Sequence, residues 1–163
     1  MNDIDIAGPF DGQTTLAEAK EWLLGQIESG QIVRCPCCTQ DAKMYQRAIT
    51  SEGARVLIDM YQTDRQDWVH AASMKSYKGG DAVKPRYWGL IEKMEGTRPD
   101  GSTRNGYWRL TDLGRRFVEG TYSPPAWVWT YDEELVAGPS GPPRGIREAV
   151  GRKFNYEDLM AGQ

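Results

Sequence analysis

The sequence predicts an α+β protein made of short helices and antiparallel hairpins. Apolar residues recur at helical spacing in several segments, other segments alternate between apolar and polar residues, and turn formers separate them. The 163 residues suffice for one medium domain, or for a small domain with an appendage. No apolar run approaches the roughly 18 residues that cross a bilayer, and the acidic first residues are unlike a secretory signal, which predicts a cytoplasmic location.

The N-terminal part is predicted to start with an amphipathic helix. Thr15 and Glu18 have the spacing of a capping box, and Gly30 supplies the stop. The apolar residues of this segment recur at helical spacing and form one side of the helix: Leu16, Ala19, Leu23 and Ile27. This side can pack within the chain or against a second copy of the protein. After a cysteine-rich turn, the alternation over residues 43–49 predicts a short strand.

Residues 50–88 predict two helices with an extended piece at residues 68–70 between them. Thr50 or Ser51 can cap the first helix. Its apolar side consists of residues at helical spacing: Ala54, Leu57, Ile58 and Tyr61. Asp81 can cap the second helix, but Pro85 disfavours helical geometry at the residue before it, so we expect a single turn that begins at Pro85.

A hairpin and a closing helix follow. Residues 90–95 and 107–110 predict the two strands, and the polar, turn-rich segment between them predicts a long tip. Thr111 can cap the next helix, in which Leu113 and Phe117 stack one turn apart. A glycine at position 120 ends it.

Aromatic residues mark the start of the C-terminal part. Trp127, Trp129 and Tyr131 alternate with smaller residues and occupy one face of a predicted strand, beside which residues 135–136 can return. Residues 138–143, rich in Gly and Pro, predict a loop or linker. The last segment has apolar residues at helical spacing and a final cap: Ile146, Val150, Phe154 and the capping Asn155.

Basic residues are concentrated in one segment of an acidic protein. The whole chain has a formal net charge of -3, whereas residues 74–116 hold ten basic and five acidic residues. A local surface that binds anions has this pattern, and so does a solvated face without a ligand.

The predicted order of elements over residues 50–120 and two segments of sequence resemble winged helix-turn-helix domains. The segments are KPRYWGLIE at 84–92 and NGYWRLTDLGRRFVEG at 105–120. A strand that ends in Leu-Thr and continues into Leu-Gly and Arg is similar to the segment after the hairpin of many bacterial winged-helix regulators. The resemblance implies three parts: a helix with a cysteine knuckle at 1–49, a winged-helix domain at 50–122 and a hairpin extension at 123–163. It implies one core in the winged-helix part: Leu57, Tyr61, Trp88, Leu90, Leu113 and Phe117.

This resemblance also implies a double-stranded DNA partner. In DNA-binding members a helix enters the major groove, while the wing contacts the backbone or the minor groove. The corresponding helix and wing residues of this chain are Lys78, Lys84, Arg86, Arg98 and Arg104. Pro85 departs from the family pattern, because it shortens the helix and leaves few outward positions for reading bases.

Three cysteines lie within four residues. Cys35 and Cys38 have the spacing with which two thiolates face one metal ion, and Pro36 stiffens the turn. A tetrahedral Zn²⁺ needs four donors. His70, the only histidine, is a candidate third ligand, and Cys37, an Asp or a partner subunit is a candidate fourth. The pattern predicts structural zinc; the alternatives are a dithiol that cycles through a disulfide, and thiols without a special role.

The whole chain is also similar to small phage or prophage proteins with a CPxC element before such a domain, which implies a bacterial host cytoplasm. The leading hypothesis is a phage-related DNA-binding protein of transcriptional-regulator type. The alternative is an interaction module that docks its acidic N-terminal helix or its Trp-rich hairpin on a host bacterial protein, and a thiol redox protein is a third. A homodimer is open in each case. No Ser-His-acid or Cys-His constellation has a recognisable context, so we do not expect an enzyme.

Overall fold

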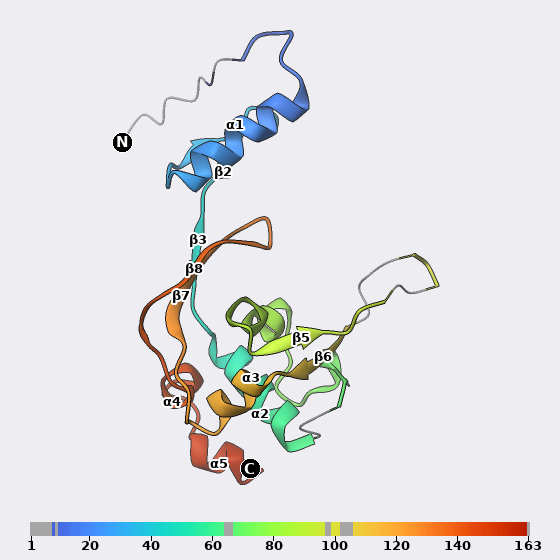
Figure 1. Cartoon of the computed structure of the whole chain (residues 1–163), viewed down its shortest axis with the longest axis vertical. Coiled ribbons are helices and arrows are strands. Elements are labelled where there is room, and N and C mark those ends of the chain that lie inside the picture. Colours follow the sequence, from blue (N-terminus) through green and yellow to red (C-terminus); the bar gives the residue numbers. More distant parts are fainter. Residues whose placement is uncertain (1–7, 9, 64–66, 97–98, 102–105, 163) are drawn as a thin grey trace. The chain divides into compact units, whose positions relative to one another are not determined.

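The computed structural model describes residues 8, 10–63, 67–96, 99–101 and 106–162. These residues form a mixed α+β structure of helices and three small sheets (Figure 1). The chain divides into unit 1, Met1–Arg47 with Trp129–Gly138, and unit 2, Ala48–Val128 with Pro139–Gln163. Within the described part of the chain, no helix combines the length and the apolar content that a bilayer crossing requires.

Unit 1 has one long helix and a small core. It contains α1 (Leu16–Glu28), β1 (Val33–Arg34), β2 (Asp41–Ala42) and β3 (Tyr45–Arg47). Strands β1 and β2 are antiparallel and enclose the cysteine turn. Strand β3 belongs to a sheet of order β3-β7-β8, in which β7 is Pro125–Tyr131 and β8 is Glu134–Pro143. The buried residues of the unit 1 cluster are Leu23, Ile27 and Ala42.

Helix α1 begins at the predicted capping box. The N–H of Glu18 donates to Thr15 Oγ1 at 3.3 Å, and the N–H of Thr15 donates to Glu18 Oε2 at 2.7 Å. Leu23 and Ile27 are buried, as their spacing predicts, but Leu16 is 77% exposed. The apolar side of α1 is therefore buried within the chain from Ala19 onward, and its first residue is left exposed.

The capping box makes α1 sensitive to pH. Hydrogen bonds from the backbone and then the hydroxyl of Thr15 lower the pKa of Glu18 below its ordinary value. The stabilisation is therefore present above the ordinary pKa of glutamate, and it is lost as the pH falls through the lowered pKa of the folded state. We expect an NMR titration to give a Glu18 pKa below that of an unstructured peptide. The first turn of α1 should fray as the pH falls, and Glu18→Gln should remove this pH dependence. An unshifted pKa would contradict the capping box.

Unit 2 is built around α2 (Ser51–Thr63). The elements that follow are β4 (Val69–His70), the 3₁₀ helices η1 (Ala71–Ser73) and η2 (Gly80–Trp88), β5 (Ile91–Lys93), β6 (Tyr107–Leu110) and α3 (Asp112–Val118). Two short helices, α4 (Ile146–Val150) and α5 (Tyr156–Met160), complete the unit. The strand order β4-β6-β5 puts β6 in the centre of an antiparallel sheet, with Val69 opposite Trp108 and Ile91 opposite Leu110.

The core of unit 2 contains most of the residues that were expected there. Leu57, Leu90 and Phe117 are fully buried, Trp88 is buried, and Tyr61 packs partly against them. Leu113 is 37% exposed, so its predicted core position was wrong. The first turn of α3 approaches the backbone of Leu90 through Gly114 instead, which turns Leu113 towards solvent.

Two segments differ from the sequence-based prediction. Pro85 lies inside η2 and does not begin it, because the 3₁₀ bonding pattern already starts with the N–H of Ala82 donating to Gly79 O at 3.2 Å. Residues 138–143, expected as a loop or linker, belong to β8. Strand β8 lies at the edge of its sheet, where prolines are tolerated because a missing N–H costs no ladder bond.

The C-terminal elements mostly follow their local signals. Alternation along β7 is confirmed: Val128 is buried, whereas Trp127 and Trp129 are half-buried. Asn155 caps α5 by accepting the N–H of Asp158 at 3.0 Å. Phe154 lies between α4 and α5 and is 39% exposed, so it does not extend the buried side of α4.

Candidate functional site

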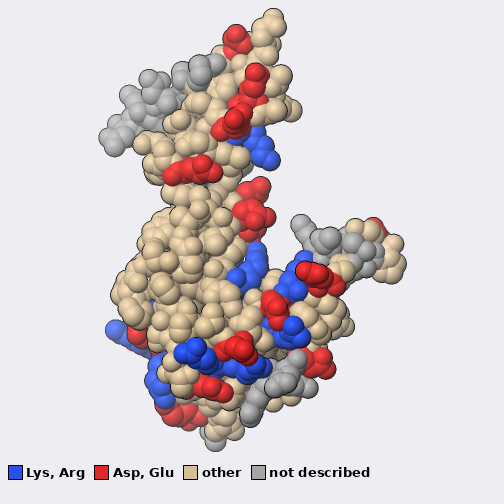
Figure 2. Space-filling model, viewed as in Figure 1, with Lys and Arg blue, Asp and Glu red and all other residues tan. Residues whose placement is uncertain are grey.

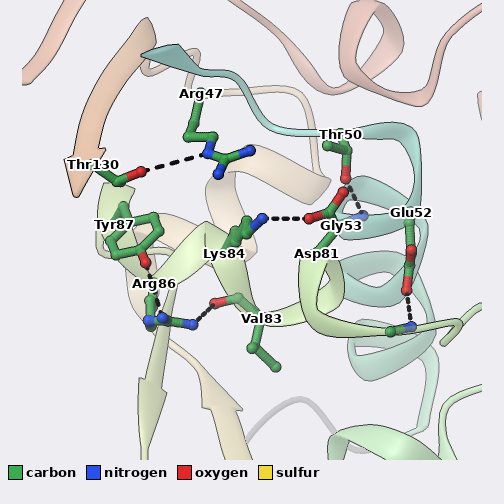
Figure 3. A network of polar contacts seen from close by, with 11 residues as sticks. Arg47, Thr50, Glu52, Gly53, Asp81, Val83, Lys84, Arg86, Tyr87 and Thr130 are labelled. Carbon is green, nitrogen blue, oxygen red and sulfur yellow. Dashed lines mark hydrogen bonds and ion pairs between the residues drawn. The ribbon is translucent and has the colours of Figure 1, made fainter. Parts of the chain in front are cut away.

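Two carboxylates of α2 hold the segment between η1 and η2. Glu52 Oε1 accepts the backbone N–H groups of Lys78 and Gly79, each at 2.7 Å, and Figure 3 shows Glu52 reaching this backbone. Asp59 Oδ2 accepts the N–H of Ser76 at 2.6 Å. Because these acids bond the backbone, they fix the segment without forming ion pairs with its lysines. We call residues 75–78 the pinned segment.

Lysine side chains project from the pinned segment. Lys75, Tyr77 and Lys78 are all exposed, and neither lysine has an acidic partner among the described residues. Lys78 is one of the residues expected to contact DNA. Lys75 was not singled out, although its spacing of three residues from Lys78 was visible in the sequence.

Lys84 and Arg86 of η2 have partners inside the chain. Lys84 Nζ lies 2.5 Å from Asp81 Oδ1, and the Lys84 side chain is only 14% exposed. Arg86 donates to Val83 O at 3.3 Å and to the Tyr87 hydroxyl at 2.9 Å (Figure 3). Both cations therefore hold η2 together, and neither is a freely projecting charge.

The hairpin also pairs two of its charges. Arg109 Nε lies 2.7 Å from Glu92 Oε1 across the two strands. Lys93 on β5 is exposed and has no acidic partner among the described residues. The two predicted wing contacts, Arg98 and Arg104, lie outside the described residues.

Charges of both signs are interspersed on unit 2. Figure 2 shows Lys and Arg side chains next to Asp and Glu over the visible face around its helices. At the start of α3, Arg115 forms an ion pair with Asp112. Of the described cations in residues 74–116, those that lack both an acidic partner and a ring contact are Lys75, Lys78 and Lys93.

The cysteine turn of unit 1 joins β1 to β2. The N–H of Cys35 donates to Gln40 O at 2.8 Å, and the N–H of Thr39 donates to Cys35 O at 2.9 Å. Thr39 closes the turn with a φ of 62°, in the left-handed region. The backbone N–H groups of Cys38 and then Cys37 donate to the Cys35 sulfur and lower the pKa of its thiol. Such donors favour the thiolate, which is the form that binds metal ions.

The predicted third ligand belongs to the other unit. His70 is in unit 2, whereas the cysteines are in unit 1. Its ring packs edge-on against Tyr107, with 5.1 Å between the centroids, and a Cβ on Gly106 would lie 2.6 Å from His70 Nε2. No group of three or more His, Cys, Asp or Glu side chains able to hold a metal is present among the described residues. Within unit 1, the candidate ligands are those of the cysteine turn.

Comparisons with protein-family models, with characterised proteins and with solved structures find no match to this chain. We therefore infer the function of this chain from the chemistry of the pinned segment and of the cysteine turn. The pinned segment of unit 2 can attract phosphate groups, and the cysteine turn of unit 1 can supply thiolates to a soft metal ion.

Proposed function

We propose that this chain is a winged-helix protein that binds double-stranded DNA through unit 2. The observation that carries the proposal is the order α2, β4, η1, η2, β5, β6, α3, together with the central position of β6 in its sheet. This order agrees with the winged-helix resemblance of residues 50–120. In the proposal, η1, the pinned segment and η2 form the helix-turn-helix part, and the β5–β6 hairpin is the wing.

The available cations favour contacts with the DNA backbone over contacts with bases. Lys75 and Lys78 project from a segment whose backbone is fixed by Glu52 and Asp59, so binding has to order their side chains but not the backbone. Lysine attracts phosphate as a point charge and carries no sequence information. Helix η2 adds little base readout, because Lys84 and Arg86 are engaged within the chain. We therefore propose binding to phage or host DNA with a weak sequence preference, so that a regulator-like role would depend on base contacts from the wing.

A salt titration tests the DNA contact. If the pinned segment and the wing neutralise three or four phosphates, log K should fall with log salt at a slope of about -3. The double variant K75A/K78A should flatten this slope to between about -1 and about -2 and weaken binding similarly for all duplex sequences. The matched control is R152A/K153A, which removes two exposed cations between α4 and α5 and should leave the slope unchanged. Equal binding by the parent and K75A/K78A would remove the pinned segment from the proposal.

Substitutions of the two arginines in the hairpin tip test the wing separately. The variant R98A/R104A should lower duplex affinity by an amount similar to K75A/K78A, because each pair removes two cations.

If the parent shows no duplex binding at low salt but retains a host bacterial protein after nuclease treatment, the interaction-module alternative replaces the DNA proposal.

A further inference from the structure

The cysteine turn provides an incomplete metal site. Cys35 and Cys38 lie on a tight turn between β1 and β2, which is closed by hydrogen bonds from the N–H of Cys35 to Gln40 O and from the N–H of Thr39 to Cys35 O. A structural zinc site has four ligands, and two cysteines separated by two residues supply half of them. The described residues contain no group of three or more potential ligands. Two further donors must therefore come from elsewhere.

An apolar groove lies directly beside this turn. It has a volume of about 320 Å³ and is bounded by α1, the cysteine turn and the start of the β7–β8 turn. Its lining includes Leu16, Cys35 and Tyr131. Leu16 is 77% exposed although it is a large apolar residue on a well-capped helix. An exposed apolar surface next to an incomplete metal site is what an interface formed around that metal would leave on the separate chain.

We infer that two copies of this chain share one tetrahedral metal ion of the zinc class, and that each copy supplies Cys35 and Cys38. A two-fold axis through the ion would place the two cysteine turns face to face and bring the two grooves together. Such an arrangement completes the four-thiolate ligand set with no donor from unit 2. The second copy is thus the occupant of the groove.

Charge and stability both favour a second copy as the partner. The groove includes one cation, Lys20, and one carboxylate, Asp132. In a two-fold interface the same surface meets itself, so a surface that holds both signs can pair Lys20 of one copy with Asp132 of the other. Among the described residues, the hydrophobic cluster of unit 1 has three buried members and five partly buried ones, and cores of this size commonly need a metal or an oligomer to be stable.

The stoichiometry of Zn²⁺ and Co²⁺ binding by the full chain tests this inference. In reducing, chelator-free buffer we expect one ion for every two chains, a change in sedimenting mass from one to two chains of 18.4 kDa when the metal is added, and a thiolate-to-cobalt absorption band. Metal affinity should rise with protein concentration, because the site is made by association. One ion per chain in a monomer, or an affinity independent of protein concentration, would overturn the inference. Failure to bind either ion would overturn it as well.

Variants separate the shared site from its alternatives. Cys35→Ser and Cys38→Ser should each abolish the cobalt band and the dimer. Cys37→Ser changes a groove residue that is not a proposed ligand, and it should retain the cobalt band. His70→Ala should bind metal as the parent does, and loss of metal in that variant would show that His70 is a ligand and would overturn the four-thiolate set. Because a cysteine variant can also unfold unit 1, Leu16→Glu provides a second test at an exposed position. It should weaken both dimer and metal affinity by roughly tenfold or more at fixed protein concentration, and parent-like values would rule out the groove as the interface.

Discussion

Replacing Gly114 with alanine is expected to destabilise unit 2 by about 3 kcal/mol or more. Gly114 lies in the first turn of α3, and a Cβ there would lie 1.9 Å from the carbonyl oxygen of Leu90. The obstructing atom belongs to the backbone directly before β5, so it cannot move aside as a flexible side chain can. The helix must instead separate from the sheet. Urea denaturation followed by tryptophan fluorescence, to which the buried Trp88 and Trp108 contribute, measures the loss.

Helix propensity alone predicts the opposite effect for Gly114→Ala. In an isolated helix, Gly→Ala stabilises by about 1 kcal/mol. The matched control is Gly25→Ala in α1, where no atom lies within 4 Å of the added Cβ. We expect that variant to be as stable as the parent or slightly more stable. A Gly114→Ala protein with the stability of the parent would mean that α3 does not approach Leu90 as described.

The second large effect is expected at Phe117. This residue is fully buried in the core around α2, and truncation to alanine should cost about 3–5 kcal/mol through lost burial and a remaining cavity. Leu113, one turn earlier on α3, is 37% exposed, and Leu113→Ala should cost less than about 1 kcal/mol. The ratio of the two losses, measured by the same denaturation, reports the orientation of α3. Equal losses would contradict the outward position of Leu113.

Leu113 and Phe117 also show that the spacing of apolar residues does not by itself predict which residues are buried. Leu113 and Phe117 have the same four-residue spacing that places Leu23 and Ile27 together in the core of unit 1. Spacing identifies a shared face of a helix, but it does not identify which part of that face meets another element. In α3 the glycine beside Leu113 allows the backbone to approach Leu90, and this contact turns Leu113 outward. The spacing of residues along α3 cannot predict this contact, because Leu90 lies outside the helix.

At the candidate DNA-binding site, too, some contacts could be predicted from the sequence and others could not. Lys78, expected to contact DNA, is exposed, whereas Lys84 and Arg86, expected in the same role, have partners within the chain. Lys84 and Asp81 are three residues apart, so their pairing was accessible from the sequence. The hydrogen bonds from Ser76, Lys78 and Gly79 to Asp59 and Glu52 could not be predicted from the sequence, because these acids lie on α2 and bond backbone groups.

The sequence alone determined the boundaries that depend on neighbouring residues. Thr15, Thr50 and Thr111 accept N–H groups at the starts of their helices, and the strand at Tyr107–Leu110 has the predicted ends. These features arise from hydrogen bonds and backbone preferences that span three or four residues.

Only the tertiary structure decided which partners those elements find. It placed β6 between β4 and β5, made the Pro-rich residues 138–143 an edge strand, and left Leu16 exposed beside the cysteine turn. Each of these outcomes depends on contacts between residues distant in the chain, and the free energy of such contacts is not encoded in any local pattern.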